Sequence, residues 1–320
     1  MPTRIRRPDD CHMRASAAAS HQINWKAVSW LAGYHLVALL ALLPWFFSWA
    51  GVVVAVASHI LLGLLGINIG YHRLLSHRSF SCPRWLEHTF AVLGVCCAQE
   101  SPAFWISAHR WHHHFADKER DPHSPLVNLL WAHVGWLLVK HDGMPRERMI
   151  ERYAPDIMRD PLYAWFERNY NWSWVLVLSW LVYFAGGFGA AVLIGENTAQ
   201  ALQFGLSVLV WGVFVRTVVG WHIAWSVNSM AHRWGYQNYA TNDNSRNNFF
   251  VALYTNGEGW HNNHHADPGA ARHGHRWWEF DVTYALIRFL AALGLVKDVV
   301  LPSVRRHEPV GGEAGSTRDA

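Results

Sequence analysis

The feature that most constrains this chain is a run of 45 residues, from Ala27 to Tyr71, without Lys, Arg, Asp or Glu. A helix rises about 1.5 Å per residue, so such a run spans roughly twice the hydrocarbon core of a bilayer. Pro44 and the aromatic residues around it favour a turn near the middle. Further uncharged runs follow at 169–195 and, with one exception, at 197–231. We therefore predict an all-α integral membrane protein with four transmembrane helices in two hairpins, near 27–47, 50–70, 172–194 and 202–224.

The distribution of basic residues predicts the orientation. The short connections near Ser48 and at 195–200 carry no Lys or Arg, whereas 71–171 carries twelve and both termini are basic. By the positive-inside rule, both termini and the long central segment face the cytoplasm. The net charge of +4 follows from this topology and does not indicate a nucleic-acid partner. Arg216, the exception in the last run, is expected to snorkel toward the interface.

The remaining segments predict one membrane domain, 26–297, between a loose cytoplasmic N-terminal tail, 1–25, and a disordered C-terminal tail, 298–320. The apolar stretches 85–98 and 280–296 are too short or too charged to cross, and we expect interfacial helices there. No cleavable signal peptide is expected. Structural disulfides are not expected either, because the cysteines lack paired spacing and most lie at the cytoplasmic side: Cys11, Cys82, Cys96 and Cys97.

Histidines with unusual spacing all fall on the same predicted side of the membrane. In "HRWHH" (109–113) and "HNNHH" (261–265) the positions i, i+3 and i+4 share one helix face, so three ring nitrogens can converge on one or two cations. The five-residue gap from His72 to His77 does not align on a regular helix and fits a helix end running into a turn. "NSMAH" places Asn228 and His232 at i and i+4 after the fourth span, where Asn228 could bind a metal weakly or hold a metal-bound water.

The other histidines lack such a pattern. Four isolated ones are interpreted as hydrogen-bonded polar residues or interface anchors: His35, His59, His88 and His222. Four more are interpreted as ordinary surface residues: His141, His273, His275 and His307.

The donor set limits the choice of metal. It contains no nearby thiolate and no H-E-x-x-H, and a structural zinc ion would need only four ligands. Eight or nine imidazoles indicate two metals, and imidazole suits iron among others. Iron beside the lipid points to activation of O2 against the unactivated C–H bonds of a fatty acyl chain.

Five ordered motifs resemble the integral-membrane fatty acyl desaturases of the stearoyl-CoA (delta-9) type, especially the bacterial and cyanobacterial members. They are "GINIGYHRLLSHRSF", "HRWHHHFADKERDPH", "HVGWLL", "NSMAH" and "GEGWHNNHH". The resemblance implies a mushroom-like, four-span fold whose cytoplasmic helical cap holds two iron ions (Fe2+/Fe3+). It implies nine histidine ligands, with Asn228 reaching one metal through water: His72, His77, His109, His112, His113, His232, His261, His264 and His265. By the same pattern, His114 and His123 are not ligands.

The resemblance also implies a reaction. Two hydrogens leave a saturated acyl chain, near its ninth carbon, at the expense of O2 and two electrons from ferredoxin or cytochrome b5. "HEPVGG" (307–312) is not the H-P-G-G motif of a fused b5 domain, so the donor is expected to be a separate protein. An arginine and an aspartate that help acyl-CoA members bind CoA are replaced by Ser107 and Ala108, which favours a lipid-bound chain without excluding acyl-CoA. The expected location is a bacterial inner membrane, with the chain in contact with membrane lipid.

Two other functions are compatible with the histidines. A related membrane di-iron hydroxylase or ketolase shares the histidine plan but inserts oxygen. A histidine-rich metal transporter or sensor would need polar residues along the spans, and the second and third spans offer only His59 and a few Ser and Asn. The motif context favours the desaturase.

Overall fold

A computed structural model describes residues 22–141 and 144–303. Within these ranges the chain is helical, with isolated β-bridges and no strand, which confirms the predicted all-α class. Most of the two predicted tails, together with Cys11 and His307, lies outside the described residues.

Four helices are long and apolar enough to cross a membrane, as predicted: Trp25–Leu42, Trp49–Ser76, Trp172–Leu193 and Thr198–Met230. The first consists of α1 (Trp25–Ala38) and a 3-10 turn, and the second of α2 (Trp49–Leu62) and a π-helical segment, Gly63–Ser76. The third is α8 (Trp172–Leu193), and the fourth runs from α9 (Thr198–Leu209) through π-helical Val210–Val215 into α10 (Arg216–Met230). The second and fourth spans continue past their predicted ends, to Ser76 and Met230.

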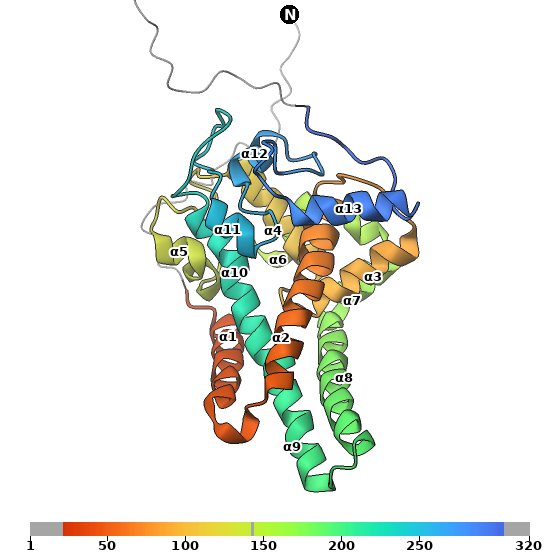
Figure 1. The fold of residues 1–320 in the computed structure, drawn as a ribbon. Coiled ribbons are helices and arrows are strands. Elements are labelled where there is room, and N and C mark those ends of the chain that lie inside the picture. The colour runs from red at the N-terminus through yellow and green to blue at the C-terminus, as the bar shows by residue number, and fades with distance from the viewer. Residues whose placement is uncertain (1–21, 142–143, 304–320) are drawn as a thin grey trace, which may run out of the picture.

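The four spans form a narrow stalk, and both hairpin turns lie at its free end (Figure 1). Large aliphatic side chains on the stalk are exposed, among them Leu42, Val53 and Leu181. Exposed apolar patches of this extent are unusual on soluble proteins and fit contact with lipid tails. Trp45 and Trp49 are exposed at the first turn, and tryptophan is enriched at membrane–water interfaces.

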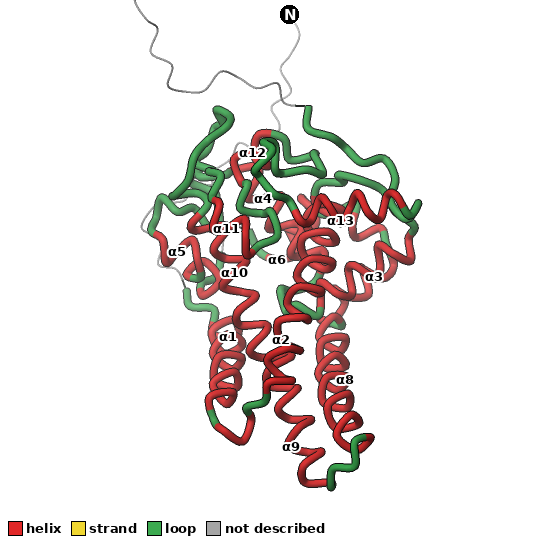
Figure 2. Tube along the Cα trace, viewed as in Figure 1, coloured by secondary structure: helices red, strands yellow, loops and turns green. Residues whose placement is uncertain are grey.

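The remaining helices form a wider cap at the other end of the stalk (Figures 1 and 2). They are α3 (Arg84–Val95), α4 (Pro102–Phe115), α5 (Leu129–His133), α6 (Arg146–Tyr153), α7 (Pro161–Glu167), α11 (Phe249–Tyr254), α12 (His261–Ala266) and α13 (Val282–Ala292). The stretches predicted as short interfacial helices are α3 and α13, although their position relative to a membrane stays a prediction.

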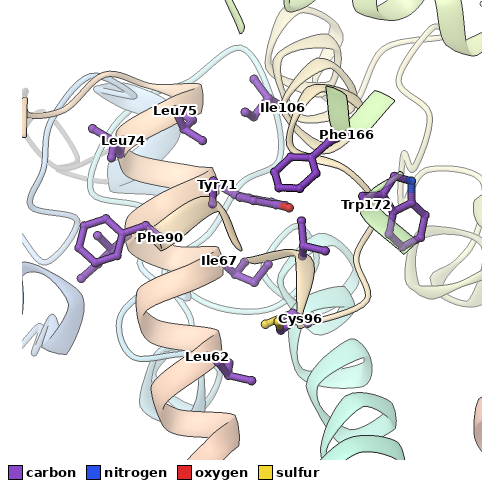
Figure 3. Close-up of a cluster of buried hydrophobic side chains, with 14 of the residues drawn as sticks. Leu62, Ile67, Tyr71, Leu74, Leu75, Phe90, Cys96, Ile106, Phe166 and Trp172 are labelled. Atoms are coloured by element: carbon purple, nitrogen blue, oxygen red, sulfur yellow. The ribbon is translucent and has the colours of Figure 1, made fainter. Parts of the chain in front are cut away.

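The hydrophobic core lies where the second span enters the cap (Figure 3). Tyr71 is fully buried there, and its hydroxyl donates to the Glu100 carbonyl oxygen at 3.2 Å. Two glycines let the span approach α3 closely: a Cβ on Gly66 would lie 2.4 Å from the Gly94 nitrogen, and one on Gly94 would lie 2.3 Å from the Tyr71 ring. This contact sets the position of the next residue along, His72.

The prediction that Arg216 snorkels to the interface is wrong. Its side chain is 3% exposed, its Nε donates to the Gly212 carbonyl oxygen, and its Nη1 donates to the Cys96 carbonyl oxygen, each at 3.0 Å. The guanidinium turns inward because backbone carbonyls at the adjacent π-helical segment and at the end of α3 accept its protons. Cys82, Cys96 and Cys97 are free thiols, as expected.

Candidate metal centre

The first pair of histidines is carried by the π-helical end of the second span. In this segment the His77 N–H donates to the His72 carbonyl oxygen at 3.2 Å, an i to i−5 hydrogen bond. The wider π turn brings residues five apart onto one face, and the two rings lie 5.0 Å apart. The expectation of a helix end was right, since His77 is the C-cap, but the alignment comes from π geometry.

The second group lies on α4. Ser101 caps this helix by accepting the Phe104 N–H, and Pro102 occupies its first turn, where a missing N–H is tolerated. Arg110, also on α4, donates to the carbonyl oxygens of Leu75 and Ser76 at the end of the second span. These bonds hold the two histidine-bearing helix ends together.

The third group lies on α12, a short helix with strong lateral anchors. The two residues between its histidines, Asn262 and Asn263, are fully buried. Asn262 accepts from the backbone N–H groups of Asn238 and Tyr239, and Asn263 donates to the Glu279 carboxylate at 2.8 Å. The spacer residues of "HNNHH" therefore fix the helix, while its histidines face the other way.

Asn228 lies on α10, which ends at Met230, whereas His232 lies in the turn that follows. His232 nevertheless joins the other histidines, and its Nε2 is 3.0 Å from the His261 Nε2. Asn228 lines a cavity together with His72, His109 and His261.

All nine predicted histidines come together, and they form two groups whose potential ligand atoms lie within 4.8 Å of one another. One group is His72, His77, His109, His113 and His264; the other is His112, His232, His261 and His265. Each H-x-x-H-H helix divides between them, because its i and i+4 rings point to one group and its i+3 ring to the other. The sequence spacing allowed either one or two cations, and the two groups provide a possible position for each of two.

Ring nitrogens in these groups face one another without an intervening acid. The His264 Nε2 lies 3.1 Å from the His72 Nε2 and 3.0 Å from the His113 Nε2, and the His77 and His109 Nε2 atoms are 2.7 Å apart. A neutral imidazole carries only one proton, so hydrogen bonds alone cannot satisfy so many converging nitrogens. The buried Nε2 atoms of His112 and His265 have no hydrogen-bond partner in the described chain. A cluster of ring nitrogens whose lone pairs lack hydrogen-bond donors fits the binding of metal ions.

Carboxylates behind the rings orient the second group. The Nδ1 atoms of His112, His232 and His265 hydrogen-bond to Asp121, Asp117 and Asp243, at 3.0, 2.9 and 2.8 Å. An Nδ1 proton donated to a carboxylate leaves the Nε2 lone pair free for a cation. In the first group, an oxygen of buried Glu258 lies 2.6 Å from the His72 Nδ1. Asp117 and Asp121 follow the second histidine group closely in the sequence, but Asp243 and Glu258 are distant from the rings they contact, so no spacing identifies them.

Electrostatics keep most of these rings neutral, as metal ligands must be. Burial, reinforced by neighbouring imidazoles, lowers the pKa well below its usual range for His77, His109, His113, His261, His264 and His265. His112 differs: burial alone would lower its pKa, but the Asp121 carboxylate outweighs burial and raises it.

His114 and His123, which the family pattern leaves out, occupy different environments. His114 is exposed, whereas His123 is buried with its ring 4.2 Å from that of His112. The interpretation of His273 as a surface residue is wrong: it is 1% exposed, its ring lies 4.4 Å from that of His264, and its Nδ1 is 3.3 Å from Glu258. A histidine outside any spaced motif gives no sequence signal of such burial.

Among the other isolated histidines, His35, His88 and His222 make polar contacts as predicted, whereas His141 and His275 are less exposed than the surface positions predicted for them. His35 and His222 contact each other at 3.2 Å between Nε2 atoms, and His88 contacts Asp160 at 2.9 Å. His141 and His275 are only partly exposed and contact the carbonyl oxygens of Trp136 and Arg272.

An apolar cavity leads away from the histidines into the stalk. At one end it is lined by His72, His109, His112 and His261, and it continues between the second span and α10 past Ile67 and Ile223. The cavity thus joins the histidine cluster, which could hold metal ions, to an apolar space within the spans that suits a hydrocarbon chain.

Asp156 should make the stability of the cap dependent on pH. It forms an ion pair with Arg110 on α4 at 2.7 Å and contacts Arg78. Burial alone would raise its pKa, but hydrogen bonds from these arginines outweigh burial and lower the pKa to about 2. The ionised form therefore stabilises the fold above the unfolded pKa of about 4, and this contribution is lost as pH falls toward the folded pKa.

We expect Asp156→Asn to lower the free energy of unfolding by about 1 kcal/mol at pH 7, a modest value because the pair is partly screened by solvent. The difference from the unsubstituted protein should shrink as pH falls from about 4. Thermal unfolding of detergent-solubilised protein at several pH values measures it, with Glu151→Gln, an exposed carboxylate on α6, as the control. An equal difference at neutral and acidic pH would contradict the assignment.

Comparison with known proteins agrees with this geometry. Residues 47–289 match the sequence profile described as fatty acid desaturase. The chain is 41% identical to an sn-1 stearoyl-lipid 9-desaturase of Synechocystis sp. over 87% of its own length and 80% of the relative's. It is 40% identical to an sn-2 palmitoyl-lipid 9-desaturase of Nostoc sp. (88% and 92%), and 38% identical to an acyl-CoA C20 Delta5-desaturase of Anemone leveillei (86% and 81%).

Proposed function

The chain belongs to the fatty acid desaturase family, and we propose that it introduces a cis double bond near the ninth carbon of a saturated acyl chain carried on a membrane lipid. It is an oxidoreductase of the desaturase class. The observation that carries the proposal is the junction of the nine-histidine cluster with the apolar cavity between the spans. The relatives from Synechocystis and Nostoc, whose names specify 9-desaturation of lipid-bound chains, support the position of the double bond.

We propose two iron ions as the cofactor, one for each histidine group, with Asn228 reaching one of them through water. Iron would supply the oxidising power, drawn from O2, that an unactivated C–H bond demands. The chain's own part is to hold the rings neutral and oriented through Asp117, Asp121, Asp243 and Glu258, and to keep the acyl chain in a site sheltered from water.

A lipid carrier is favoured over CoA by two observations. Ser107, which replaces a CoA-binding residue of acyl-CoA members, is fully buried and donates its hydroxyl to the Phe104 carbonyl oxygen at 2.8 Å. Small, partly exposed residues line the cavity between the second span and α10, namely Gly63, Gly220 and Ala224. Such residues leave room for a chain to enter sideways from the bilayer. The acyl-CoA desaturase of Anemone leveillei among the relatives makes the carrier a matter for direct test.

We also propose that the cap and both termini face the cytoplasm, in a bacterial inner membrane, because Lys and Arg concentrate on the cap side of the spans. A separate ferredoxin or cytochrome b5-type protein would then deliver the two electrons to the cap.

Expression in a host with little unsaturated lipid tests the function. We expect new monounsaturated chains with the double bond at the ninth carbon. When the host is supplied with an isotope-labelled saturated acid, the labelled unsaturated product should appear first in glycerolipid. Loss of two hydrogens distinguishes desaturation from hydroxylation or ketone formation, in which the product gains oxygen. An oxygenated product, or no altered chain in a strain that supplies a compatible electron donor, would contradict the proposal.

A further inference from the structure

The fourth span contains a charged group with an unused hydrogen-bond donor. Arg216 is 3% exposed, and its Nη2 has no hydrogen-bond partner in the described chain, although its other nitrogens bind two carbonyl oxygens. It forms no ion pair with any described carboxylate. The next residue, Thr217, is 2% exposed, and its hydroxyl is also unpaired. Buried polar atoms without partners are rare and call for a cause.

Both residues line the cavity that reaches the histidines, at a position far from them. Along α10 the lining residues recur at helical spacing, from Arg216 and Thr217 through Gly220 and Ala224 to Asn228. Arg216 and Asn228 are twelve positions apart, which corresponds to about 18 Å along a helix. The histidines lie at the Asn228 end, so Arg216 marks the opposite end, in the interior of the stalk.

The opposite wall of the cavity, formed by the second span, likewise runs from the histidines toward the interior of the stalk. The second span lines the cavity with His72 near the cluster, then Ile67 and Gly63, and finally His59. Gly220 faces His59 closely, since a Cβ added there would lie 3.4 Å from the His59 Nδ1. Between its two ends the cavity is lined by small or apolar residues, namely Gly63, Ile67, Gly220, Ile223 and Ala224. It is polar at the histidine end, where Asn68, Asn228 and Glu258 also line it, and polar again where Arg216, Thr217 and His59 meet it.

We propose that Arg216, assisted by Thr217, is the end wall that limits the length of acyl chain the protein accepts. This inference rests on the proposed function. A chain with its reacting carbon at the histidines extends its methyl end toward Arg216. A methyl group pressed against the guanidinium would exclude water from a charged donor and offer no acceptor in return, which disfavours chains long enough to reach it. Shorter chains leave room for water at the donor.

The test is the chain-length profile of full-length protein in membranes of a host supplied with saturated acids that differ by two methylenes. In Arg216→Met, which is apolar and of similar length, we expect conversion of the first rejected chain length to rise about tenfold relative to the preferred one. Thr217→Val should shift the profile in the same direction but less. Arg216→Lys retains the charge and should keep the original limit. Arg288→Met, which removes an exposed arginine on the cap, is the matched control.

The outcomes separate this inference from the proposed function. If the protein without substitutions forms no double bond in any acyl chain, the proposed function itself is overturned. Double bonds with an unchanged length limit in both Arg216→Met and Thr217→Val would overturn only the end wall. A Lys variant that shifts as far as the Met variant would show that Arg216 acts through its carbonyl hydrogen bonds alone, which also overturns the proposal. If the Met variant does not accumulate, Thr217→Val decides.

Discussion

Replacement of His109 or His261 by alanine is expected to reduce unsaturated product by at least about a thousandfold while the protein still accumulates in the membrane. Each substitution removes one nitrogen from a different group, His109 from the first and His261 from the second. An incomplete ligand set lowers metal affinity and distorts the remaining geometry, so oxidation should stop.

Iron content and product are measured together for each variant. Purified His109→Ala or His261→Ala protein should bind less iron than the unsubstituted protein, and elemental analysis should give about two irons per chain in the latter. His114→Ala is the matched control, because His114 lies on the same helix and is exposed. Near-normal product from either variant, or active protein without iron, would contradict the metal centre.

The spans were the most predictable part of the fold. Long uncharged runs leave few structures other than membrane helices, because every backbone group in lipid must be paired within its own helix. The helix ends were less predictable. The second span runs on to Ser76 and the fourth to Met230, since contacts with the cap continue the helices after the apolar pattern has ended.

The convergence of histidines that share a helix was predictable because helical spacing is local. His109 and His113, one turn apart, must face the same way on any helix. The division between two groups was not predictable, since it depends on how α4, α12 and the second span pack. The π-helical turn that aligns His72 with His77 was not predictable either, nor was the close approach of Gly66 and Gly94 in the same region.

Isolated polar residues were the least predictable. His273 and Arg216 stand alone in the sequence, and their most common environments are the surface and the interface. The structure buries both of them. For His273 the reason is Glu258, and for Arg216 it is the carbonyl oxygens of Gly212 and Cys96. Such partners come from distant parts of the chain and are known only once the helices are packed.

Glu258 itself carries the second large prediction. One of its oxygens lies 2.6 Å from the His72 Nδ1, and the other accepts from Arg73 at 2.9 Å. Burial alone would raise the pKa of Glu258, but Arg73, with His72 and His273, outweighs burial and holds the pKa well below its usual range. The carboxylate therefore stays ionised, orients the His72 ring and balances a fully buried arginine.

We expect Glu258→Gln to lower metal affinity by about 10- to 100-fold, the range typical for removing a carboxylate that holds a ligating histidine. The loss should concern the His72 group, so the variant should retain about half of its metal at concentrations that saturate the unsubstituted protein. Arg73 keeps Asp281 as a partner at 2.9 Å, so the fold should survive the substitution. Metal titration followed by elemental analysis measures the effect, with Glu119→Gln, an exposed position on the cap, as the control.

Equal metal affinity and equal product in Glu258→Gln and the control would show that Glu258 serves the fold alone. Loss of both metals together would mean that the two histidine groups bind metal as one cooperative unit, since α4 and α12 each carry histidines of both groups. We expect separate loss, because the second group has its own orienting carboxylates, Asp121, Asp117 and Asp243.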